Sequence, residues 1–286
     1  MDKGRQVFRI CAGNLKRISG NPRLYLAFAW FAMTIAFYMV QVRRLAYSLG
    51  ETVSAWVFPL LMVKSGNQMF FILGAVLLFC DAPFLYDNSG WQILRAGRRT
   101  WFWGNILYIG VLSLLYTAVV SLLPAVFAIP KLSLANEWGR LIGSLGQTNL
   151  ASQSGLTSLS YIIMSRYSPL EAMGIAGLAA WLNAILVGVV SYAANLLLKQ
   201  GAGAVICMAM GLTPVIISGA LPPVSYFAYY LSPPSWINPE NYNRRGYGAA
   251  PSPLYIYLAF VVLIAGCVLA ARIGIVKKDL YTIQDI

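Results

Sequence analysis

The stretch Trp101–Ile129, WFWGNILYIGVLSLLYTAVVSLLPAVFAI, decides the fold of this chain. It holds 29 residues without a single Asp, Glu, Lys or Arg. A helix needs about 20 apolar residues to cross the roughly 30 Å hydrocarbon core of a bilayer. The stretch is therefore longer than one crossing requires, and we expect it to tilt or to project beyond the bilayer.

Further apolar segments flank this stretch on both sides and alternate with polar connections. They are Leu24–Val42, Gln68–Tyr86, Glu171–Leu198, Ala202–Leu221 and Leu254–Ile273. The piece 53–63, which contains Pro59, is either the outer half of a kinked second span or a partly embedded external helix. We predict an all-α, polytopic integral membrane protein with six transmembrane helices, in which residues 1–286 form a single domain.

The composition and the distribution of charge agree with this class. The 286 residues are 59% hydrophobic and only 10% charged, whereas about 25% of the residues of a soluble domain are charged. The net charge is +12, but the cations flank apolar segments. The positive-inside rule therefore explains them better than nucleic-acid binding does, and we expect the lipid bilayer, with no nucleic acid, as the environment of this chain.

The positive-inside rule also predicts the orientation. With the N-terminus inside, the inner connections hold 13 of the 21 Lys and Arg in 60 residues, and the outer ones hold eight in 98 residues. Both termini are therefore expected in the cytoplasm. The inner segments are 1–23, 82–100, 199–201 and 272–286, and the outer segments are 43–67, 130–170 and 222–253. Residues 1–23 mix apolar and basic side chains, as in a helix lying on the inner membrane surface, and a disordered basic tail is the alternative.

The sequence offers little to an enzyme. It contains no histidine, and its nine carboxylates form no DxxD, HExxH or ExxxE pattern. It has no GxxxxGK[ST] loop that could hold ATP phosphates, and its four cysteines form no CxxC pair. We predict no catalytic, cofactor or metal site in this chain. We expect Asn183 and Asn195 to bond between helices, and Ser168 and Glu171 to form a capping box at the start of the fourth span.

The inner connection between the second and third spans is the most distinctive segment. After the break at Pro83, the residues 87–100 predict a short helix with Trp91 and Leu94 on one side, followed by arginines. An arginine cluster that only sets the topology would explain Arg98 and Arg99. It would not explain the aromatic residue in a short cytoplasmic helix.

This arrangement resembles the membrane subunit of a bacterial type-2 ABC transporter, the exporter-like permease class. The resemblance covers the whole chain in architecture, and it is carried by the pattern DAPF…W…R.GRR.W over residues 81–101, followed by LY, and by the ending 276–280, VKKDL. The external segment 130–170 is longer than is usual in that class. The second external segment, 222–253, would hold re-entrant helices.

The resemblance implies a permease driven by a separate subunit. The short helix would be a coupling helix on which an ABC-type ATPase docks, and that partner would bind the ATP and Mg²⁺. A second permease subunit, a copy of this chain or a different one, would complete a dimer in the plasma (inner) membrane. By carry-over, the coupling residues are Trp91, Ile93, Leu94, Arg95 and Arg98.

Two functions from different classes follow. The first is the transmembrane subunit of an ATP-driven exporter that moves a hydrophobic, lipid-like or peptide substrate. The second is a membrane scaffold or immunity protein that transports nothing and binds a partner through its external loops. The helix within 87–100 separates them, because only the transporter requires it.

Overall fold

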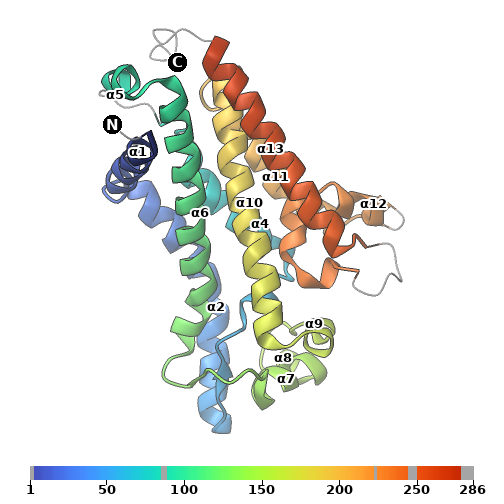
Figure 1. Ribbon diagram of the computed structural model, residues 1–286. Helices are drawn as coiled ribbons and strands as arrows, with labels where there is room; N and C mark the ends of the chain where they lie inside the picture. The colour runs from blue at the N-terminus through green and yellow to red at the C-terminus, as the bar shows by residue number, and fades with distance from the viewer. Residues whose placement is uncertain (1–2, 85–88, 222–223, 244–249, 278–286) are drawn as a thin grey trace.

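The long helices of the computed structural model run side by side in one elongated bundle (Figure 1). The structure describes residues 3–84, 89–221, 224–243 and 250–277. The long helices are α2 (Pro22–Leu49), α4 (Ser65–Phe79), α6 (Arg98–Ala128), α10 (Pro169–Leu197), α11 (Ala202–Ser218) and α13 (Pro253–Lys277). The shorter helices are α1 (Lys3–Ile18), α3 (Phe58–Leu61), α5 (Ser89–Ala96), α7 (Gly139–Gln147), α8 (Leu150–Gln153), α9 (Tyr161–Arg166), α12 (Val224–Tyr230) and the 3₁₀ helices η1 (Pro233–Ile237) and η2 (Pro239–Asn241).

Four of these helices, α2, α6, α10 and α13, are long and apolar enough to cross a membrane. The prediction of an all-α membrane protein is confirmed at this level. Helices α4 and α11 are apolar but have only 15 and 17 residues. At about 1.5 Å per residue they are about 22 and about 26 Å long, which is less than the roughly 30 Å of a bilayer core. Six crossings therefore remain a prediction.

The second predicted span differs from the helix observed. It was placed at Gln68–Tyr86, whereas α4 covers Ser65–Phe79 and the chain turns immediately afterwards. The upstream apolar piece contains the separate helix α3, whose four residues are buried and which packs against α6 and α10. Pro59 lies in its first turn, where the missing N–H costs nothing. The piece is therefore a short helix packed on the bundle and not the outer half of a kinked span.

The two ends of the bundle carry different elements (Figure 1). Helices α1 and α5 and the C-terminal end of α13 lie at one end, and α7, α8 and α9 lie at the other. We call these the α5 end and the α7 end. The grouping agrees with the predicted alternation of inner and outer connections, but which end faces the cytoplasm remains a prediction. Residues 278–286, with most of the predicted C-terminal motif, and parts of 87–100 and 222–253 lie outside the described residues.

Predicted helix starts are confirmed where capping residues mark them. The Ser168 hydroxyl accepts a hydrogen bond from the Glu171 N–H at 3.4 Å, with Pro169 as the first helical residue of α10.

At the α7 end, β1 (Val53–Ser54) pairs in parallel with β2 (Leu132–Ser133), which joins the chain after α2 to the chain after α6.

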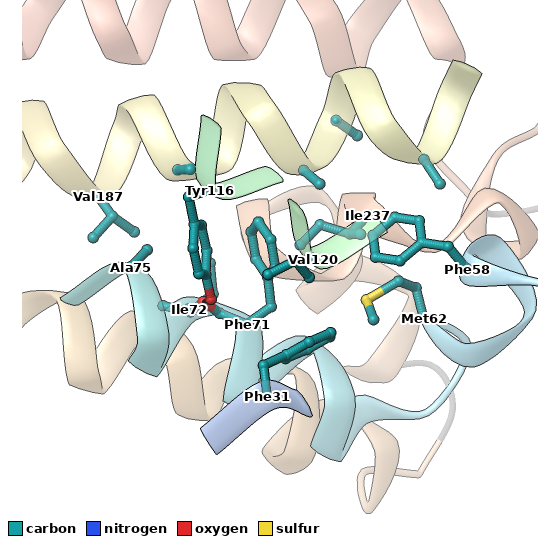
Figure 2. Packing of buried hydrophobic residues seen from close by; sticks show 14 of the residues in the cluster. Phe31, Phe58, Met62, Phe71, Ile72, Ala75, Tyr116, Val120, Val187 and Ile237 are labelled. Carbon is teal, nitrogen blue, oxygen red and sulfur yellow. Dashed lines mark hydrogen bonds between the residues drawn. The ribbon is translucent and has the colours of Figure 1, made fainter. Parts of the chain in front are cut away.

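Aromatic side chains fill the space between α2, α4 and α6 (Figure 2). Phe31, Phe71 and Tyr116 are fully buried, and the Phe71 and Tyr116 ring centroids lie 5.0 Å apart. The Tyr116 hydroxyl donates to the Phe71 carbonyl at 2.9 Å, so its one buried polar atom is satisfied. Side chains therefore fill this part of the bundle.

Helix α11 approaches α10 closely at Gly203. A Cβ atom at this position would lie 2.5 Å from the Ser191 Cα atom and 2.7 Å from its carbonyl oxygen. Such contacts with backbone cannot be relieved by a rotamer change. Only glycine therefore permits this helix spacing, as small residues commonly do between membrane helices.

We expect Gly203→Ala to destabilise the protein by about 1–3 kcal/mol, because the new methyl group must push α11 from α10. The matched control is Gly177→Ala in α10, where a Cβ atom meets nothing within 4 Å. That substitution should stabilise the helix by about 0.5–1 kcal/mol, through the lost backbone freedom of glycine. Titration with sodium dodecyl sulfate in mixed micelles measures both free energies of unfolding, and equal effects would contradict the packing described.

Candidate functional site

The turn that follows α4 is fixed to the long helices by an asparagine of α10. The Asn195 amide donates to the Ala82 carbonyl at 2.7 Å and to the Cys80 carbonyl at 3.2 Å. Its oxygen accepts from the Gly203 N–H at 2.8 Å. One buried side chain thus joins α10, the turn after α4 and the first turn of α11. The prediction that Asn195 bonds between helices is confirmed.

A second buried asparagine holds the same turn from α6. The Asn105 amide donates to the Pro83 carbonyl at 3.4 Å and to the Tyr192 hydroxyl at 3.5 Å. Its oxygen accepts from the Asn14 amide of α1 at 2.9 Å. Asn105 is missing from the residues predicted to bond between helices, although it is the only Asn, Asp, Gln or Glu in the stretch Trp101–Ile129. Its position as the single such residue in an apolar stretch was the feature of the sequence that could have indicated its role.

Aromatic rings close the turn against the bundle. Phe84 is buried, with φ of +61°, and its ring centroid lies 4.9 Å from that of Tyr108 and 6.4 Å from that of Tyr192. Asp81, which was expected at the inner end of the second span, forms an ion pair with Arg23 at the start of α2. Residues 80–84 therefore contact α2, α6 and α10, and we call this segment the α4–α5 turn.

Helix α5 packs against α6. Ile93 is 4% exposed and Leu94 is 71% exposed, so the helix presents one apolar side chain to the protein and one away from it. Arg95 is exposed as well, whereas Arg98 begins α6 and is half-buried. The predicted short helix is confirmed, within the bounds Ser89–Ala96. The side chain of Trp91 lies outside what the structure describes.

Two arginines lie at the junction between α5 and α6, at a helix end where positive charge does not stabilise the helix. Gly97 separates the two helices with φ of +81° and ψ of 149°, a conformation that is essentially restricted to glycine. Arg98 and Arg99 then occupy the first turn of α6, which contains no acidic residue. The helix dipole disfavours cations at that end by about 0.3–1 kcal/mol each. Their placement therefore has another cause, which is membrane topology or a partner.

Asn183 is a further buried amide that bonds between helices. The Asn183 amide donates to the carbonyls of Ala179 and Pro233, each at 3.0 Å, so it joins α10 to η1 as expected. Within the described ranges, no three His, Cys, Asp or Glu side chains lie together in a way that could hold a metal ion.

Comparison of the chain with protein-family models, with curated proteins and with solved structures found no match. The geometry of the α4–α5 turn and of α5 is therefore the basis on which a function can be inferred.

We expect Asn195→Ala to lower the stability of the bundle strongly. The substitution removes the partner of two carbonyls and one N–H, and each buried group left unbonded costs about 1–3 kcal/mol. Asn149→Ala is the matched control, because Asn149 is exposed and its side chain bonds to none of the described residues. Thermal unfolding in one detergent, followed by tryptophan fluorescence, compares the two variants. An equal loss in both would show that Asn195 does not join these segments.

Proposed function

We propose that this chain is the membrane-spanning subunit of an ATP-driven exporter in a bacterial plasma membrane. A separate ABC-type ATPase would dock on α5 and would supply the ATP and Mg²⁺ chemistry. The substrate would be hydrophobic, lipid-like or a peptide. The observation that carries the proposal is a short helix with an exposed apolar residue, packed against α6, which also bonds to the turn after α4.

The exposed side of α5 supports docking of a protein. Leu94 is exposed beside the cation of Arg95, and such an apolar residue rimmed by charge suits a protein contact. Ile93 faces the bundle and would act by anchoring α5 rather than by touching the partner. Arg98, at the α5–α6 junction, would lie at the edge of the contact.

The attachment of α5 supports transmission of movement. A push on α5 acts directly on α6, against which it packs, and through Asn105 of α6 on the α4–α5 turn. Asn195 and Asn105 connect that turn to α10, α11 and α1. Movement at the α5 end would therefore be shared by several long helices instead of being absorbed in a loose loop. This is the mechanical requirement for an ATPase that never enters the membrane.

The packing of the bundle supports a second membrane subunit. Phe31, Phe71 and Tyr116 fill the interior between α2, α4 and α6 (Figure 2). Only 17% of the most apolar stretch of α13 is buried, so one side of this helix faces lipid or another chain. A path for substrate would then lie between two subunits, which are copies of this chain or two different chains.

We expect the tagged chain, purified in mild detergent from its native host, to carry a stoichiometric soluble protein with a P-loop. Leu94→Glu should release that protein, because burying the new carboxylate without a partner would cost several kcal/mol. Gel filtration and ATPase activity of the purified complex are the measurements.

The control is Leu134→Glu. Leu134 is 72% exposed, against 71% for Leu94, but it lies near the α7 end after β2. It should retain the ATPase. A chain that purifies without any ATPase in several mild detergents would contradict the proposal. Loss of a different partner with Leu134→Glu alone would instead support the scaffold or immunity function.

A further inference from the structure

A pocket of about 230 Å³ lies toward the α7 end, between α2, the start of α4 and the loop between α8 and α9. Its polar lining comes from Thr34, Tyr38 and Gln41 of α2, from Lys64 and Asn67, and from Thr157. None of these residues takes part in the α5 site, at the opposite end of the bundle. The pocket therefore requires an explanation of its own.

The amine of Lys64 is held in position within this pocket. It donates to the Thr157 hydroxyl and lies 5.0 Å from the centroid of the Tyr38 ring, which is a cation–π contact. The Tyr38 hydroxyl in turn donates to the Thr157 carbonyl at 3.0 Å, which fixes the loop against α2. The cation is thus positioned by two elements that are distant from it in sequence, α2 and the loop between α8 and α9.

The charge of Lys64 is not neutralised by the surrounding protein. Of the carboxylates that the structure describes, none lies within 4.0 Å of its amine. Partial burial lowers the pKa of Lys64, which reflects an incomplete hydration shell around the cation. A lysine has three N–H donors, and Thr157 uses one. The Gln41 amide, which lines the pocket from α2, bonds to none of the described residues and offers further donors.

An apolar strip adjoins the pocket on the outer face of α2. Trp30, Met33 and Phe37 are 53%, 76% and 78% exposed, and their spacing places them along one side of the helix. Phe37 also lines the pocket. A molecule with its head at Lys64 could therefore lay an apolar chain along this strip, within the part of α2 that is apolar enough to cross a membrane.

We propose that this pocket binds the anionic head group of an amphiphile, with a phosphate at Lys64 and an acyl chain along Trp30, Met33 and Phe37. The amine and the Gln41 amide supply the donors for phosphate oxygens. The strip supplies apolar contact, which a free phosphate cannot use. This inference does not depend on the proposed ATPase, because it concerns the purified chain alone.

The test is native mass spectrometry of the full chain in a non-ionic detergent. The probes are phosphatidylglycerol and phosphatidylcholine with identical acyl chains. We expect phosphatidylglycerol to bind about tenfold more tightly, which corresponds to about 1.4 kcal/mol. Lys64→Gln should remove this preference, and Lys64→Arg, which keeps the charge, should retain most of it.

Lys131→Gln is the matched control. The Lys131 amine lies 5.4 Å from the Tyr47 ring, so this variant also removes one charge and one cation–π contact, but outside the pocket. It should bind both lipids as the original chain does. Equal binding of the two lipids, or equal losses in Lys64→Gln and Lys131→Gln, would overturn the proposal. Thermal unfolding without added lipid shows whether each variant is folded.

A competition experiment distinguishes a lipid from a free anion. Inorganic phosphate, at the concentration of the bound phosphatidylglycerol, should fail to displace it, because phosphate makes no contact with the apolar strip. Displacement at equal concentration would show that the pocket recognises phosphate alone, and it would overturn the assignment to an amphiphile.

Discussion

The carbonyls of Cys80 and Ala82 face α10, and the amide of Asn195 supplies both with a donor. The same side chain accepts from Gly203, where α11 comes so close to α10 that a methyl group would not fit. The hydrogen bonds and the close packing therefore depend on one another. Without Asn195, the α4–α5 turn would lose its hydrogen bonds to α10, and the contacts of Phe84 and Asn105 would have to hold it.

Local sequence signals predicted the elements of the fold well. The uncharged stretch Trp101–Ile129 corresponds to α6, and the Ser168 cap marks the start of α10. These signals succeed because length, apolar composition and capping are properties of neighbouring residues. The end of α4 was misplaced, because the span was extended through Pro83 to Tyr86, although proline disfavours a helical conformation in the residue before it. The turn at 80–84 is held in place by its bonding to α6 and α10, which connects residues distant in sequence.

The candidate site was predictable only in part, for the same physical reason. The short helix and the role of Asn195 followed from Trp91, the arginines and an amide in an apolar run. The contact of Asn105 with Asn14 joins residues 91 positions apart. The Lys64 pocket likewise needs Tyr38 and Thr157 to meet through the tertiary fold. In the positive-inside count Lys64 was one cation among many, because charge alone does not show which lysines and arginines the fold holds in place.

Helices α2 and α6 are fastened to one another at both ends. At the α7 end β1 pairs with β2, and at the α5 end α1, which leads directly into α2, is bonded to α6 through Asn14 and Asn105. The two helices therefore form one stiff unit, about 45 Å long at 1.5 Å per residue. Because the pair resists bending and the sliding of one helix past the other, it moves by rotating as a whole. A tilt imposed at one end would then reappear at the other with little delay or loss.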